Sequence, residues 1–170
     1  MSLLKYLIIH CTATPEGRNV SAETLKHWHT DPPPNGQGWH QVGYSDLILL
    51  DGNRHQFVKH NNDLIVDSFE ITNGVLGYND ISRHVCYVGG MDQWYKNPKD
   101  TRSENQNKTL IDLIHEVLAY APDIKIGGHN QFNNKACPSF FVPVWLEEIG
   151  IPEKNIERRD PFGYHLFFSK

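Results

Sequence analysis

Short hydrophobic runs alternate with segments of helical periodicity along this chain. Apolar, branched residues predict buried strands at residues 3–9, 42–50, 84–88 and 124–126. Asp51-Gly52 follows the second of these runs and predicts a tight hairpin turn into a strand over residues 54–58. Residues 59–79 are polar and poorly periodic, so we expect them to be mainly loop.

Helical spacing marks three other segments. Ser21 is a suitable N-cap for a helix that reaches about residue 30. Ser103 and Gln106 form a capping-box pattern before the longest helix, which Pro122 ends. Its apolar positions lie on one face: Leu110, Ile111, Ile114, Val117, Leu118 and Ala121. A short helix should run from about residue 142 toward Gly150. Strands interleaved with helices predict an α/β fold with a mixed central β-sheet flanked by helices.

Composition narrows the class of protein. The chain has 170 residues, enough for one compact domain, with 39% hydrophobic and 21% charged residues. A net charge of −4, without long runs of Lys and Arg, argues against a nucleic-acid partner. The apolar runs are too short to span a bilayer, so we expect no membrane insertion. Three cysteines cannot all pair within one chain, which disfavours a disulfide scaffold.

Most of the ten histidines are expected to have ordinary structural roles. His27 and His29 flank Trp28 on a predicted helix and should lie at the surface. His115 lies within the longest helix, where a partly buried, hydrogen-bonded imidazole is the default. The other histidines without a recognisable partner spacing are His40, His55, His60, His84 and His165.

Three residues have the chemistry of a metal site. His10 ends an apolar strand, and side chains at strand ends face the loops where sites are assembled. His129 and Cys137 lie eight residues apart in a Gly- and Asn-rich loop. A catalytic zinc uses three N and S ligands and keeps one position for water. A structural zinc site is less favoured, because no Cys-x-x-Cys pair is present. The alternative for Cys137 is a structural role as a small, buried hydrophobic residue.

Five sequence words occur in a specific order. They are IHCTAT at residues 9–14, VGY at 42–44, GYN at 77–79, VGG at 88–90 and KACPSF at 135–140. Together they resemble the amidase-2 family of N-acetylmuramoyl-L-alanine amidases, which includes phage lysozyme-amidases and peptidoglycan recognition proteins. The resemblance extends over residues 3–146.

The resemblance implies a role for five residues. His10, His129 and Cys137 match the three ligands of one Zn²⁺ ion. Tyr44 matches a tyrosine beside the metal that assists proton transfer, and Lys135 matches a lysine that stabilises the charged intermediate. The implied reaction is zinc-dependent hydrolysis of the amide bond between N-acetylmuramic acid and L-alanine in peptidoglycan. From spacing alone, Tyr44 would be an ordinary strand-edge aromatic and Lys135 a solvated lysine.

The sequence departs from the family pattern in several places. Ser45 and Asn130 replace residues that are often histidine or another polar or basic residue in relatives, and residues 72–74 replace a histidine followed by alanine. Residues 32–38 form an insertion without a counterpart. We assign residues 1–150 to the catalytic domain and 151–170 to a C-terminal tail of unknown role that packs on the same domain.

The resemblance also implies a substrate groove beside the zinc, which holds the stem peptide and the muramic acid. Tyr78 and Asn79 are the candidates to line it, followed by Trp39 and then His40. Exposed aromatic side chains commonly line sugar and peptide grooves, although a packed aromatic residue is an equally good interpretation.

Three other functions are compatible with parts of this pattern. A non-catalytic peptidoglycan-binding module on the same fold is the main alternative, and Cys137 argues against it, because recognition proteins that only bind commonly lack this cysteine. A zinc-free interaction protein and a zinc amidase acting on another acylated peptide are the others. The N-terminal segment has no signal-peptide cleavage pattern. We therefore expect a monomer made in the cytoplasm that acts as a released endolysin, a recycling enzyme or an effector.

Overall fold

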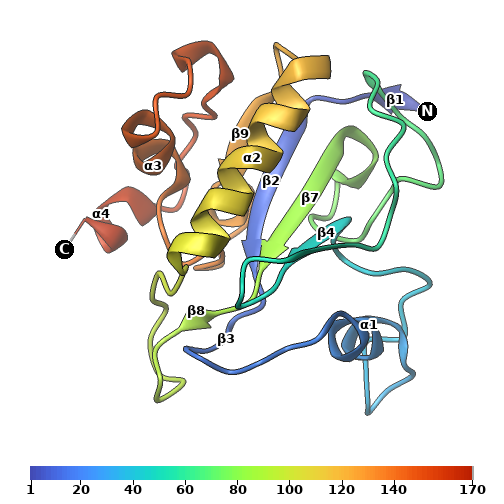
Figure 1. Cartoon of the computed structure of the whole chain (residues 1–170), viewed down its shortest axis with the longest axis vertical. Coiled ribbons are helices and arrows are strands. Elements are labelled where there is room, and N and C mark those ends of the chain that lie inside the picture. The colour runs from blue at the N-terminus through green and yellow to red at the C-terminus, as the bar shows by residue number, and fades with distance from the viewer. Residues whose placement is uncertain (170) are drawn as a thin grey trace.

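A mixed five-stranded sheet forms the centre of the computed structural model, which describes residues 1–169 (Figure 1). The strand order is β5-β4-β7-β2-β9. β7 lies parallel to both β2 and β4, β9 lies parallel to β2, and β5 pairs antiparallel with β4. The strands are β2 (Tyr6–Cys11), β4 (Asp46–Ile48), β5 (Arg54–Gln56), β7 (Ser82–Tyr87) and β9 (Lys125–Gly128). The predicted α/β fold with a mixed sheet is confirmed.

Four short strands lie outside this sheet. β1 (Ser2–Leu3) pairs antiparallel with β6 (Ile65–Val66), and β3 (Thr14–Pro15) pairs parallel with β8 (Gly90–Met91). The first predicted strand, over residues 3–9, is therefore divided between β1 and β2. The prediction of one strand over residues 42–50 was wrong outside β4. Its first residues belong to a loop, where the Val42 carbonyl accepts a hydrogen bond from the Asn73 N–H at 3.1 Å.

The helices begin where their capping residues predict. α1 (Ala22–Thr30) follows Ser21, whose hydroxyl accepts the Thr24 N–H, and α2 (Glu104–Tyr120) begins with the complete Ser103–Gln106 capping box. The remaining helices are α3 (Val142–Glu148) and α4 (Tyr164–Phe168). Three 3₁₀ turns complete the described structure: Asn79–Ile81, His129–Gln131 and Glu153–Asn155.

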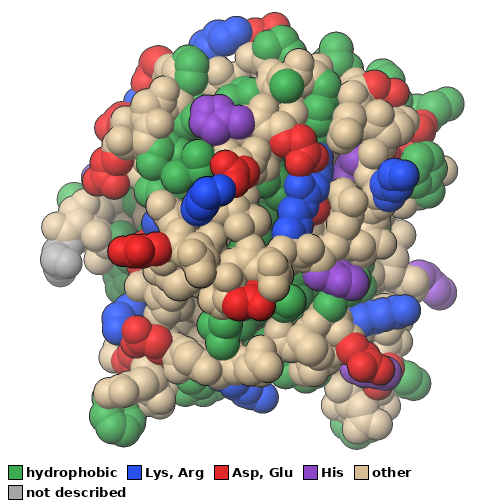
Figure 2. Space-filling model, viewed as in Figure 1, with side chains coloured by type: hydrophobic (Ala, Val, Ile, Leu, Met, Phe, Trp, Pro, Cys, Tyr) green, Lys and Arg blue, Asp and Glu red, His purple; other side chains and the backbone are tan. Residues whose placement is uncertain are grey.

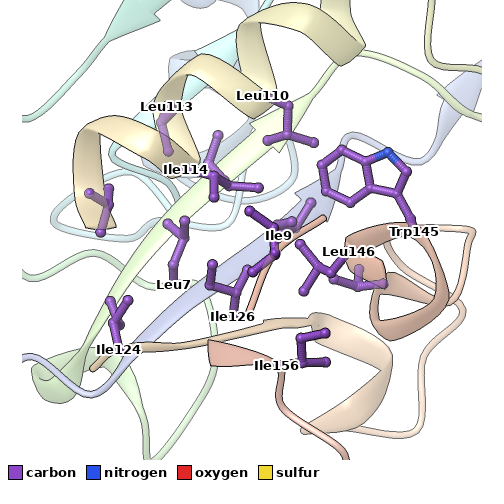
Figure 3. Packing of buried hydrophobic residues seen from close by; sticks show 14 of the residues in the cluster. Leu7, Ile9, Leu110, Leu113, Ile114, Ile124, Ile126, Trp145, Leu146 and Ile156 are labelled. Atoms are coloured by element: carbon purple, nitrogen blue, oxygen red, sulfur yellow. The ribbon is translucent and has the colours of Figure 1, made fainter. Parts of the chain in front are cut away.

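The two faces of the sheet bury different side chains. α2 lies across one face (Figure 1), where Leu7 and Ile9 of β2 pack against Leu110 and Ile114 (Figure 3). A second apolar cluster, on the opposite face, contains Val20, Leu25, Leu47, Cys86 and Val88. Because successive side chains of a strand point to opposite faces, His10 points away from α2. The site therefore lies on the face that α2 leaves uncovered.

Residues after α3 pack on the same core. Ile151 and Ile156 are buried members of the main apolar cluster, and Ile156 bridges to Ile126 of β9. Trp145 and Leu146 of α3 lie in the same cluster (Figure 3).

Within residues 1–169, every helix is too short or too polar to cross a membrane. The face covered by α2 carries acidic and basic side chains side by side (Figure 2).

Candidate metal centre

His10, His129 and Cys137 converge although they come from distant parts of the chain. Their ligand atoms all lie within 4.8 Å of one another, and the distance from Cys137 Sγ to His10 Nδ1 is 3.8 Å. The rings of His10 and His129 have centroids 4.7 Å apart. His10 lies near the end of β2 and His129 directly follows β9, so the parallel pairing of these two strands brings the histidines together.

Hydrogen bonds fold the loop after β9 back on itself, which brings Cys137 to the histidines. The Asn130 N–H donates to the Cys137 carbonyl at 2.7 Å, and the Asn130 side-chain amide donates to the Phe140 carbonyl at 3.0 Å. Gln131 Oε1 accepts the Gly128 N–H at 2.9 Å. Asn130 is fully buried, so it fixes the conformation of this loop and does not face a groove.

Burial keeps the two histidines neutral. Burial, followed by the charges of His129 and His84, lowers the pKa of His10 well below its ordinary value. Burial and then the charge of Lys135 lower the pKa of His129 to about 4. Both imidazoles therefore have a free lone pair at neutral pH, which metal ligation requires.

Cys137 is suited to bind a cation. Burial raises the pKa of its thiol well above the usual range, so a thiolate at this position needs a positive charge beside it. The Cys11 backbone N–H donates to Cys137 Sγ at 3.3 Å, and such a donor favours the thiolate. Two neutral imidazoles and one thiol form a donor set that fits a borderline-soft divalent metal and fits Ca²⁺ or Mg²⁺ poorly.

Tyr44 and Lys135 both lie beside this cluster. The ring centroid of Tyr44 is 4.8 Å from that of His10. Burial raises the pKa of the Tyr44 hydroxyl well above its ordinary value, so the phenol remains a hydrogen-bond donor. Lys135 is exposed, and its positive charge contributes to lowering the pKa of both His10 and His129.

An open pocket of about 400 Å³ adjoins the cluster, with His129 and Lys135 in its wall. Of the residues predicted to line a groove, Trp39 and Asn79 lie in this wall as well. The exposed side chain of Leu76 forms another part of it.

Tyr78 lies elsewhere. Its ring packs against Tyr6 and Phe132, with centroids 5.7 and 4.9 Å away, and its hydroxyl accepts a hydrogen bond from Arg159. His40, the weakest groove candidate, is exposed. Ser45 is fully buried and donates its hydroxyl to the His84 carbonyl at 2.7 Å.

Two expectations for the remaining histidines were wrong. His29 is buried, because residues 37–39 fold over α1 and Trp39 stacks on the imidazole with centroids 5.0 Å apart. Its Nδ1 accepts the Gly43 N–H at 3.1 Å. His115 is exposed on α2 instead of partly buried. His27 is exposed, as predicted.

Sequence reasoning also missed His84. This residue is fully buried on β7, and its Nδ1 lies 3.0 Å from Nε2 of His10. His84 lies two positions before Cys86, the residue that pairs with His10 across the parallel strands. That register is not visible in a single sequence.

Comparison with known proteins identifies an amidase family and phage endolysins as relatives. A family model described as N-acetylmuramoyl-L-alanine amidase matches residues 2–140. The endolysin of Enterobacteria phage K11 is 32% identical over 139 residues, which is 82% of this chain and 83% of that protein. The endolysin of Escherichia phage T7 is 32% identical over 143 residues, 84% of this chain and 85% of that protein.

Solved structures share the fold. The Ph2119 endolysin from a Thermus scotoductus bacteriophage superposes with a TM-score of 0.66 and 21% identity, covering 92% of this chain and 88% of that one. Bumblebee PGRP-SA superposes with a TM-score of 0.67 and 21% identity, covering 94% and 87%.

Proposed function

This chain belongs to the N-acetylmuramoyl-L-alanine amidase family, and on that premise we propose that His10, His129 and Cys137 bind one catalytic Zn²⁺ ion. The chain is an amidase that hydrolyses the bond between N-acetylmuramic acid and L-alanine in peptidoglycan. The observation that carries the zinc proposal is the approach of the three ligand atoms to within 4.8 Å of one another. A three-ligand N and S set is typical of catalytic zinc, which keeps a position open.

Zinc supplies Lewis acidity when bound, because it polarises a carbonyl group and activates water for attack at neutral pH. The chain's own residues supply the rest. Lys135 places an ammonium group at the pocket wall, where it stabilises the negative charge that develops on the carbonyl oxygen during attack. Tyr44 holds a proton close to His10, and we assign it the transfer of a proton to the leaving amine.

The pocket beside the cluster is our candidate for the substrate groove. Trp39 offers an indole face to a sugar ring or peptide, and Asn79 lies in the same wall. The Asn79 side-chain oxygen accepts the Val75 N–H at 2.8 Å, which leaves its amide N–H groups for a ligand. Tyr78 does not line the pocket, and we assign it the role of holding the neighbouring Asn79 in place through its contacts with Phe132 and Arg159.

The relatives suggest where the protein acts. They are named endolysins of phages, and we propose that this chain likewise acts as a monomer on the cell wall after its release. We assign catalysis to residues 1–150 and a supporting role to residues 151–170. A non-catalytic binding module is not favoured, because Cys137 completes the ligand set.

Metal analysis combined with an activity assay tests this proposal. We expect about one zinc per chain in purified protein, release of free peptide amino termini from peptidoglycan, loss of that activity on chelation and recovery with added zinc. Hydrolysis that is unaffected by complete zinc removal would contradict a catalytic zinc. A protein that binds zinc but leaves peptidoglycan intact would contradict the substrate.

A further inference from the structure

We infer that His84 is a positioning residue for the metal centre: it accepts the Nε2–H of His10 and so directs Nδ1 of His10 toward the metal. Gly74 belongs to the same arrangement, because it leaves the space that the His84 imidazole occupies. This inference rests on the proposed role of His10 as a zinc ligand and adds a residue that controls how well that ligand binds.

The strand register places the two histidines side by side. β2 and β7 are parallel, with Ile8 opposite His84 and His10 opposite Cys86. Side chains at these positions share the sheet face that α2 leaves uncovered, so His10 and His84 are diagonal neighbours on it. Their ring centroids are 5.2 Å apart, and both side chains are fully buried. Water therefore does not replace either partner easily.

The two ring nitrogens of His10 face different partners. Nδ1 lies 3.8 Å from Cys137 Sγ, and Nε2 lies 3.0 Å from Nδ1 of His84. A nitrogen that binds a metal uses its lone pair, so the other nitrogen of a neutral imidazole carries the hydrogen. If Nδ1 of His10 binds zinc, its Nε2–H must donate to Nδ1 of His84. Such a bond fixes the tautomer and the ring orientation of a metal ligand.

The same reasoning assigns the tautomer of His84. With Nδ1 as the acceptor, the single hydrogen of the neutral ring is on Nε2. Nε2 of His84 is buried and has no hydrogen-bond partner within residues 1–169. Leaving a buried polar atom unpaired is unfavourable. The burial of a histidine at position 84 therefore needs a reason other than full hydrogen bonding of its ring. Among residues 1–169, the one side-chain hydrogen-bond partner of this ring is the proposed metal ligand His10.

Gly74 is required by the volume of the imidazole. A Cβ atom at this position would lie 2.7 Å from Cε1 of His84 and closer still to Nδ1 and Cγ. These atoms belong to a rigid, fully buried ring. With any other residue at position 74, either this backbone or the imidazole must shift, and we expect the contact between His84 and His10 to be disturbed. Gly74 and His84 are thus one structural unit.

Zinc affinity separates a positioning role from a purely structural one. His84→Leu removes the acceptor, whereas His84→Asn keeps an oxygen acceptor near the position of Nδ1. By competition with a chromogenic chelator, we expect zinc affinity to fall about 10–100-fold in His84→Leu and by no more than about threefold in His84→Asn. Near-ultraviolet circular dichroism of the metal-free forms checks that both variants are folded. Equal zinc affinity of native protein and a folded His84→Leu would overturn the inference.

Two glycines of one loop provide a matched comparison. Gly74→Ala should lower zinc affinity in the same direction as His84→Leu. Gly77→Ala is the control, because a Cβ there meets no atom within 4 Å, although its φ of +83° makes the substitution strained. A loss in Gly77→Ala as large as in Gly74→Ala would mean that loop strain, and not the imidazole, causes the effect, and would overturn the role of Gly74.

Nitrogen-15 NMR of the native, zinc-loaded protein decides the question without any variant. We expect the hydrogen of His10 on Nε2 and an unprotonated Nδ1 on His84. A hydrogen on Nδ1 of His10 would overturn the inference even if His84→Leu fails to fold. Failure of the proposed function looks different: native protein that binds no zinc would remove the metal centre itself, whereas tight zinc binding that is indifferent to His84 would remove only this inference.

Discussion

The backbone N–H of Cys11 donates a hydrogen bond to Sγ of Cys137, 3.3 Å away, across 126 positions of the chain. Cys11 is the last residue of β2 and follows His10 directly. One strand end therefore supplies one proposed metal ligand and also contacts the sulfur of another. Since N–H donors favour a thiolate, this hydrogen bond from the end of β2 favours the form of Cys137 that binds a cation.

Tyr44→Phe should separate proton transfer from metal binding. The Tyr44 ring lies beside His10, and burial keeps its hydroxyl protonated, so the variant removes a proton donor and little volume. We expect kcat on peptidoglycan to fall by about 10²-fold or more while zinc content is unchanged. Full activity of a zinc-loaded Tyr44→Phe would remove Tyr44 from the reaction.

Lys135→Ala should also reduce catalysis with zinc retained. Its ammonium lies in the wall of the pocket next to His129, where it can stabilise an oxyanion. The loss of one such group typically reduces kcat by about 10²–10³-fold. Lys108→Ala is the control, because Lys108 is an exposed lysine on α2 that pairs with Asp112. Similar kinetics for the two variants would show that Lys135 is an ordinary surface lysine.

The clustering of the three proposed ligands could be predicted from sequence, but their surroundings could not. His10, His129 and Cys137 lie in sequence words that resemble a known family, and the structure brings all three together. His84 carries no such word. Its contact with His10 depends on the register of β2 and β7, which is a property of the packed sheet.

Local pattern was also insufficient where loops fold over elements. Gly43 lies in an apolar run that predicts a strand. In the structure it lies outside the sheet, and its N–H donates to His29. His29 lies one turn after the buried Leu25, and the rings of Trp39 and Tyr44, which come from the loop after α1, pack against its imidazole. By contrast, capping residues such as Ser103 act within one turn, and the helix that they predict is confirmed.

Stability should fall in acid, partly because of His29. Burial lowers its pKa to about 4, and its Nδ1 accepts the Gly43 N–H, so protonation breaks this contact. In the unfolded chain, the pKa of this histidine is about 6.5. Between about pH 6.5 and 4, the unfolded chain therefore binds more protons at His29 than the folded chain does. The free energy of unfolding therefore decreases as pH falls through this window, by at most about 3 kcal/mol from this residue.

Urea unfolding of the metal-free protein at several pH values measures this effect. His29→Asn, whose oxygen can still accept the Gly43 N–H, should flatten the loss of stability between about pH 6.5 and 4. His27→Asn on the same helix should leave the loss in place, because His27 is exposed and Asp31 raises its pKa. An unchanged acid dependence in His29→Asn would show that His29 does not contribute.

The C-terminal segment should contribute to the stability of the catalytic domain. Ile156 is buried in the main cluster and bridges to Ile126. Ile156→Ala should lower the free energy of unfolding by about 2–5 kcal/mol in a single transition. Phe162→Ala, at a residue that is 43% exposed, serves as the control and should have a small effect. A separate transition or no loss in Ile156→Ala would mean that residues 151–170 are not part of this domain.

Zinc content of Cys137→Ser, measured together with release of peptide amino termini from peptidoglycan, tests the central claim most directly. Cys86→Ala is the control for zinc content, because Cys86 is another free cysteine of the chain and lies outside the ligand cluster. We predict about one zinc per chain in the native protein and in Cys86→Ala, activity in the native protein, and neither zinc nor activity in Cys137→Ser. A folded Cys137→Ser that retains equimolar zinc and hydrolyses peptidoglycan at the native rate would contradict the account.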